Sequence, residues 1–175
     1  MQTMITKKLI LLSTTLLLTT AIWAQGAKAS PADSAIGKIN KATITIRYSS
    51  PSVKGRKIWG ELVPFDKVWR AGANSATTFE TDKDITIEGQ KLAAGKYSLY
   101  ALVGEKEWTI MINSQTGQWG ITRAGETTED PAKDVLRIKV KPKKSDAMNE
   151  RLLYVIHPKG FSLKWENLEV PVSVK

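Results

Sequence analysis

The sequence contains no cysteine and only one histidine among its 175 residues. Without thiols the chain cannot form disulfides, a cysteine nucleophile or a lipid anchor on an N-terminal cysteine. One histidine without a thiolate also excludes the usual zinc ligand sets. The fold must therefore hold by packing alone, and we expect no metal and no other cofactor.

Long hydrophobic runs are equally scarce. The one extended apolar run, residues 9–18, is shorter than the roughly 20 residues of a membrane-spanning helix. Lys7 and Lys8 precede this run, and small residues around Ala24 follow it. That order is typical of a secretory signal peptide, residues 1–24, with an uncleaved anchor as the alternative. We therefore expect an exported protein, periplasmic or secreted, without stable membrane insertion after cleavage.

Charge and composition indicate one globular domain. Hydrophobic residues make up 42% of the chain and charged residues 25%, the balance of a soluble domain. Residues 25–35 are small and polar and are expected to form a flexible leader before a single domain at 36–175. The formal charge of +9 favours an anionic small molecule or envelope polymer as partner. Nucleic acid is a poor partner for an exported protein, and the oligomeric state stays open.

Most of the chain after the leader alternates apolar and polar residues with a period of two, which predicts half-buried strands. Glycine and proline separate the segments every 8–12 residues or so, residues 114–133 are expected to form a long loop, and no long helix is indicated. This pattern favours an all-β fold, an antiparallel β-sandwich or flattened barrel. About nine strands are expected, at residues 42–48, 76–81, 85–87, 97–103, 108–113, 136–140, 152–156, 161–165 and 168–174.

The C-terminal strands carry further detail. Residues 152–156 are apolar on both faces, as expected of a central strand. The apolar face of residues 161–165 continues in residues 168–174, and Glu166-Asn167 is expected to form the turn of a hairpin between them. Pro171 cannot donate to a ladder, which predicts that the last strand is an edge strand.

One long segment resembles a known family. Residues 48–79, YSSPSVKGRKIWGELVPFDKVWRAGANSATTF, together with KLAAGKYSLYAL and EWTIMIN, resemble a bacterial exported-protein family catalogued as domain of unknown function 2911. The likeness spans nearly the whole chain after the signal peptide and implies an exported all-β protein. It implies no activity, substrate or catalytic residue. Ser50 stands where the family pattern has an arginine, so any role of that arginine is absent.

Catalytic candidates are few, and the catalytic residues are unknown. A Ser–His hydrolase would depend on His157, which is more simply interpreted as a strand-end histidine at a turn. Paired carboxylates could hydrolyse a glycosidic bond, but the 17 acidic residues do not show which pair. The acidic segments 82–88 and 126–134 lack a known metal-binding spacing and are more often solvated turns.

Binding candidates gather around the segment VWRAGANSATTF, residues 68–79. An aromatic residue stands beside a cation there, and a guanidinium beside an aromatic core needs an acceptor or a ligand. A second basic segment, KGRK at residues 54–57, could present cations and backbone N–H groups to an anion. The candidate ligand-binding residues are Arg56, Trp59, Trp69, Arg70 and Asn74.

Three hypotheses follow for the function. The first is a non-catalytic binding module for a small anionic or sugar-like ligand or an envelope polymer. The second is an envelope hydrolase that uses carboxylates or His157. The third is a structural or interaction protein without a small ligand, in which residues 68–79 are only a corner of the fold.

Overall fold

The structure, a computed structural model, describes residues 29–175 as an all-β fold. The predicted signal peptide, and the leader up to residue 28, lie outside the described residues. Within residues 29–175 there is no helix that could span a bilayer. The strands are β1 (Ala32–Ile39), β2 (Ala42–Ser49), β3 (Val68–Trp69), β4 (Thr77–Thr81), β5 (Ile85–Ile87), β6 (Gln90–Leu92), β7 (Gly95–Leu102), β8 (Trp108–Asn113), β9 (Asp134–Val140), β10 (Lys143–His157) and β11 (Gly160–Ser173).

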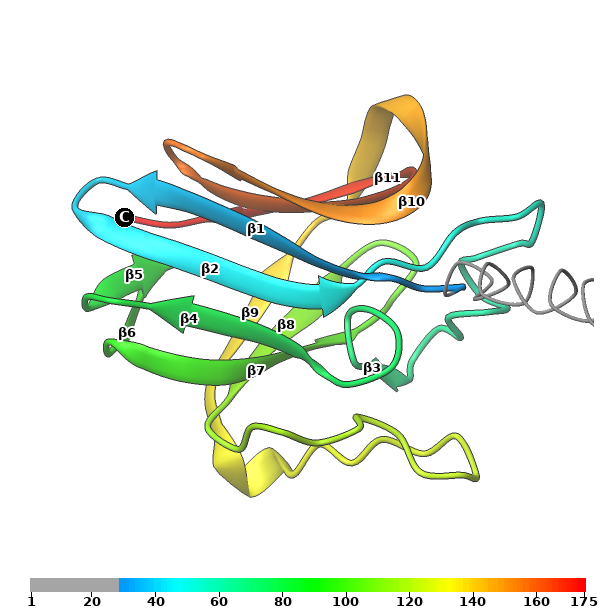
Figure 1. Cartoon of the computed structure of the whole chain (residues 1–175), viewed down its shortest axis with the longest axis horizontal. Helices are drawn as coiled ribbons and strands as arrows, with labels where there is room; N and C mark the ends of the chain where they lie inside the picture. The colour runs from blue at the N-terminus through cyan, green and yellow to red at the C-terminus, as the bar shows by residue number, and fades with distance from the viewer. Residues whose placement is uncertain (1–28) are drawn as a thin grey trace, which may run out of the picture.

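One large antiparallel sheet organises the molecule. Its strand order is β1-β2-β4-β7-β8-β9, and the short strand β3 pairs with β7. The long pair β10–β11 lies across one face of this sheet, and the small pair β5–β6 lies at one end (Figure 1). The strand path of the large sheet ends at β1 and β9, so the described chain is an open sandwich rather than a closed barrel.

The core lies between the large sheet and the β10–β11 pair. Ile46, Leu99 and Ile110 from the large sheet share one apolar cluster with Phe161 and Trp165 from β11. All five are almost completely buried. The period-two prediction is therefore confirmed for the strands that carry this core.

Three strands, β1, β3 and β6, were not predicted from the sequence. Strand β1 begins at Ala32, inside the range expected to be a flexible leader, and pairs with β2 along its whole length. Most of its residues are exposed and only Ile39 is fully buried, so the sequence shows little alternation and the pairing with β2 defines most of the strand. The very short strands β3 and β6 were missed for a related reason, because two or three residues are too few to show a period.

The predicted turn at Glu166-Asn167 is wrong, and β11 runs through it as one strand. The buried face switches there from odd positions, such as Trp165, to even positions, such as Val170. Glu166 has a positive φ of 52° and faces Asn149, where the ladder to β10 shifts register. A bulge of this kind inserts one residue and returns the following side chains to the same face. The predicted common buried face is thus confirmed, although a bulge and not a hairpin creates it.

Strand β10 is longer than predicted and is not a central strand. It spans 15 residues and forms a ladder only with β11 among the described strands. Leu152 and Tyr154 are buried against the core, whereas Leu153 and Val155 on the opposite face are only half-buried. Pro171 of β11 lies beyond the last β10–β11 pair, Lys143 with Glu169, so its missing donor interrupts no ladder.

Candidate functional site

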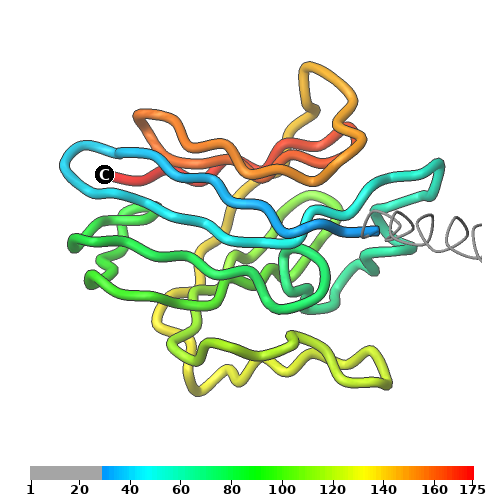
Figure 2. Tube along the Cα trace, in the orientation of Figure 1, coloured from blue at the N-terminus to red at the C-terminus, as the bar shows by residue number. Residues whose placement is uncertain are grey.

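A cavity of about 660 Å³ opens at the end of the sandwich that carries β3. The loop before β3, β3 itself with the corner after it, and the tip of the 114–133 loop form most of its wall, and Ser30 and Trp165 of β11 complete it. Figures 1 and 2 show these loops at one end of the molecule. The walls of the cavity are formed by Ser30, Pro51, Arg56, Leu62, Val63, Pro64, Asp66, Lys67, Val68, Trp69, Arg70, Gly72, Ala73, Ile121, Gly125, Glu126, Thr127 and Trp165.

Four tryptophans pack against one another at this end of the molecule: Trp59, Trp69, Trp108 and Trp165. Trp69 stacks on Trp165, with ring centroids 6.0 Å apart and planes 18° apart. Trp59 contacts both of these rings edge-on and also contacts Trp108. Of the four, Trp69 and Trp165 reach the cavity wall, whereas Trp59 packs behind them. Trp59 therefore supports the site and does not line it.

Arg56 is an exposed cation at the cavity wall. Its guanidinium donates hydrogen bonds to the carbonyls of Ser52 and Val53, at 2.5 and 3.1 Å. These bonds close the turn that contains Lys54 and Gly55, both with positive φ. Within residues 29–175 the Arg56 guanidinium forms no ion pair, so its charge is balanced only by carbonyl dipoles.

Arg70 is half-buried and joins the cavity to the long loop. It donates to the carbonyl of Trp119 at 3.1 Å, and its guanidinium lies 5.6 Å from the centre of the Trp119 ring. Gly120 comes so close that a Cβ there would lie 2.7 Å from the Arg70 Cβ. Burial lowers the pKa of Arg70, and a nearby Tyr100 partly offsets this. Arg70 is therefore fixed in place by internal contacts, as expected for a structural role.

The corner that follows Arg70 is built from buried backbone. Ala71 is fully buried with a φ of 51°. Its carbonyl accepts hydrogen bonds from the hydroxyls of Thr77, at 3.0 Å, and Tyr154, at 2.8 Å. A Cβ on Gly72 would lie 2.8 Å from the Thr77 hydroxyl. The corner thus requires glycine because the chain approaches Thr77 closely, not because of an unusual φ.

Asn74 belongs to this corner rather than to the cavity. It has a φ of 58°, a conformation that asparagine tolerates better than most residues. Its side-chain amide donates to the carbonyl of Ser30 at 3.1 Å, which ties the corner to the start of the described chain. Asn74 does not line the cavity, so of the five predicted residues the structure brings Arg56, Trp69 and Arg70 to one wall.

Trp165 was not among the predicted site residues. It was predicted as a core residue, and it is 1% exposed, yet one part of it forms cavity wall. Its indole N–H has no hydrogen-bond acceptor among the described residues. Buried indole N–H groups usually have a partner. No sequence signal could have found this feature, because it depends on the contact of β11 with β3.

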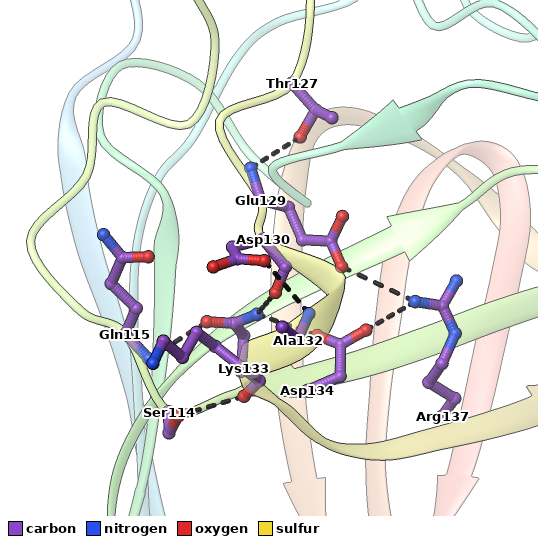
Figure 3. A network of polar contacts seen from close by, with 10 residues as sticks. Ser114, Gln115, Thr127, Glu129, Asp130, Ala132, Lys133, Asp134 and Arg137 are labelled. Carbon is purple, nitrogen blue, oxygen red and sulfur yellow. Dashed lines mark hydrogen bonds and ion pairs between the residues drawn. The ribbon is translucent and has the colours of Figure 1, made fainter.

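A second polar cluster lies outside the cavity, beneath the 114–133 loop. The Glu129 and Asp134 carboxylates both point at Arg137 (Figure 3), with Glu129 3.5 Å from its guanidinium. Both carboxylates are almost completely buried. Burial, aided by the neighbouring Asp134, raises the pKa of Glu129 to about 7. The short hydrogen bond from Arg137 to Asp134 leaves Glu129 the less well compensated acid.

The remaining catalytic candidate lies away from both clusters. His157 is the last residue of β10 and pairs with Gly160 across a turn, and it does not line the cavity. Within residues 29–175 no group of three histidine, cysteine or acidic residues could hold a metal ion. The described cavity is therefore an apolar and aromatic chamber with cations at its wall.

Residues 48–79, the segment on which the family resemblance rests, supply twelve of the eighteen residues of the cavity wall. Residues 30–174 match the family described as "Protein of unknown function (DUF2911)". The chain belongs to this family. Neither a curated protein nor a solved structure matches the chain. Family DUF2911 carries no described activity, so the function must be argued from the cavity itself.

Proposed function

We propose that this DUF2911 protein is a non-catalytic binding module whose ligand occupies the cavity beside β3. The ligand is a small anionic or sugar-like molecule, or a unit of an envelope polymer. The observation that carries this proposal is the combination of a cavity of about 660 Å³ with the Trp69–Trp165 wall and the Arg56 cation. Cavities of roughly 300–1,000 Å³ with apolar walls and a few polar groups are typical of small-molecule sites.

The walls support binding more than hydrolysis. His157 lies outside the cavity, which leaves Asp66 and Glu126 as its two carboxylates. Both are exposed, whereas the catalytic acid of a glycoside hydrolase typically lies in a hydrophobic pocket. The best-formed acid pair, Glu129 with Asp134, is engaged by Arg137 outside the cavity.

Thermal shift measurements test the proposal. The full-length chain is melted with a panel of carboxylates, phosphates, uronic acids and neutral sugars, and a ligand of the cavity should raise the Tm. Ala73→Trp would fill the cavity from its half-buried wall position, and Ala132→Trp, on an exposed turn, is the matched control. The stabilisation should disappear only in Ala73→Trp. Equal stabilisation of both variants would place the ligand elsewhere and overturn the proposal.

We also propose that the protein is exported to the periplasm or the medium. Lys7, Lys8, the apolar run and the small residues around Ala24 support this. Removal of residues 1–24 from the 175 would leave 151 residues with a formal charge of +7. Intact-mass measurement of the protein recovered from its host should show this loss or a cut a few residues away, and a retained N-terminus would contradict it.

A further inference from the structure

We infer that the ligand of the cavity is an organic monoanion: one carboxylate attached to an apolar, aromatic or acyl body. This inference rests on the proposed function and narrows it from anionic or sugar-like ligands to one chemical class. Two independent features of the wall support it: its net charge and its shortage of neutral polar side chains.

The charge of the wall matches a single negative charge. Arg56, Lys67 and Arg70 supply three positive charges, and Asp66 and Glu126 supply two negative ones, which leaves a net charge of +1. None of the three cations forms an ion pair within residues 29–175. A guanidinium that donates only to backbone carbonyls keeps free N–H groups for a carboxylate, which its planar fork fits well.

The shortage of neutral polar side chains argues against a sugar. Among the described residues of the wall, Ser30 and Thr127 are the only ones with a hydroxyl side chain, and none has an amide side chain. A sugar presents a hydroxyl on most of its ring carbons, and each buried hydroxyl needs a partner. The wall instead offers apolar surface to a ligand body, from Leu62, Val63, Pro64, Val68, Trp69, Ile121 and Trp165.

Isothermal titration with matched probe pairs tests the inference on the full-length chain. The probes are 2-naphthoate against 2-naphthamide, octanoate against 1-octanol, glucuronate against glucose, and inorganic phosphate alone. We expect each apolar carboxylate to bind about tenfold or more tightly than its neutral partner, the factor for one hydrogen bond to a charged group. We expect no measurable binding of the sugars or of phosphate, because they lack an apolar body.

Variants locate the carboxylate. Arg56→Gln should weaken 2-naphthoate binding about tenfold and leave 2-naphthamide unchanged. Arg47→Gln is the control, since Arg47 is exposed and pairs with Glu80 on β2 away from the cavity. Circular dichroism melts confirm that each variant is folded before it is titrated.

The outcomes separate the inference from the proposed function. Equal binding of naphthoate and naphthamide, with loss of both in Ala73→Trp, would overturn the monoanion and leave the binding module standing. Tighter binding of glucose or glucuronate than of the apolar carboxylates would do the same in favour of a sugar. Failure of the whole probe set and of the broader thermal shift panel would overturn both. An unchanged affinity in Arg56→Gln would overturn the placement of the carboxylate and with it the inference.

Discussion

The two faces of strand β7 contact different parts of the molecule. Leu99 and Ala101 point into the apolar core beneath β10–β11. Ser98 and Tyr100 are just as completely buried, but they face the polar 114–133 loop, where Ser98 bonds to the Gln118 side chain. One strand thus separates the large apolar core from a smaller interior in which an apolar cluster of Ala76, Tyr100 and Met111 lies beside polar groups of the loop.

The interior beneath the loop has more unsatisfied polar groups. Tyr100 Oη, Gln118 Nε2, Thr128 Oγ1 and Glu129 Oε1 lack a hydrogen-bond partner there, against the indole nitrogens of Trp59 and Trp165 in the apolar core. The Tyr100 and Thr128 hydroxyls lie near each other, but neither has a hydrogen-bond partner. Tyr154 on the apolar side, in contrast, donates to Ala71 at 2.8 Å. We therefore expect the apolar layer between the large sheet and β10–β11 to carry more of the stability than the 114–133 loop layer, which holds one wall of the cavity.

The largest effect is expected from the apolar layer. Trp165→Ala removes a buried aromatic ring that contacts Trp59 and Trp69. The free energy of unfolding should fall by about 3–5 kcal/mol, the range for aromatic side chains truncated in a core. Urea unfolding followed by circular dichroism measures it. Trp119→Ala is the control, since Trp119 is 58% exposed and should change stability far less. A loss within experimental error in Trp165→Ala would show that the β11 register is wrong.

A matched pair of tyrosines gives the next largest effect and the sharpest comparison of the two layers. Tyr154→Phe removes a buried hydroxyl bonded to Ala71 and leaves that carbonyl with the Thr77 hydroxyl alone. It should lower the free energy of unfolding by about 1–2 kcal/mol. Tyr100→Phe removes a hydroxyl without a partner and should change it by less than about 0.5 kcal/mol, or stabilise the protein. Equal losses of unfolding free energy in the two variants would mean that the two layers do not differ in how well their buried hydroxyls are hydrogen-bonded.

Arg70→Lys tests the link between the cavity and the loop layer. Lysine keeps the charge but loses the planar fork that reaches the Trp119 carbonyl and lies over its ring. We expect a loss of about 1 kcal/mol and a fall in Tm of about 2–4 °C. Arg47→Lys, at an exposed ion pair, should be nearly neutral. A normal Tm in Arg70→Lys combined with weaker ligand binding would assign Arg70 to the ligand instead of the fold.

The last prediction concerns Glu129, whose contribution to stability appears as a dependence on pH. Its pKa is raised from 4.5 to about 7, so the folded state binds a proton more tightly than the unfolded state. The protonated form therefore favours folding below pH 4.5, and this advantage is lost as the pH rises to and beyond about 7. The groups that face Glu129 are Tyr100, Asp130, Asp134 and Arg137.

Glu129→Gln should remove that slope. Its Tm should match the wild type near pH 4.5 and exceed it at pH 8, because glutamine keeps the shape of the protonated acid without the buried charge. Glu105→Gln, at an exposed turn, should leave the difference between pH 4.5 and pH 8 unchanged. If Glu129→Gln melts below the wild type at pH 8, the Arg137 ion pair outweighs the cost of burying the carboxylate.

Most of the fold could be predicted because strand alternation is a local property of the chain. Residues 42–48 and 108–113 place every second side chain in the core, and burial drives that pattern directly. Strand β1 and the bulge at Glu166 could not be predicted in this way. The first depends on hydrogen bonds to β2, and the second on the ladder with β10.

The candidate site was likewise predictable only in part. Residue types alone pointed to Arg56, Trp69 and Arg70, and these three do meet at one wall. That Asn74 bonds to Ser30, that Trp59 packs behind the wall and that Trp165 completes it follows from the packing of distant segments. The physical reason is that side-chain character and alternation belong to neighbouring residues, whereas a cavity is formed by segments about a hundred residues apart that packing alone brings together.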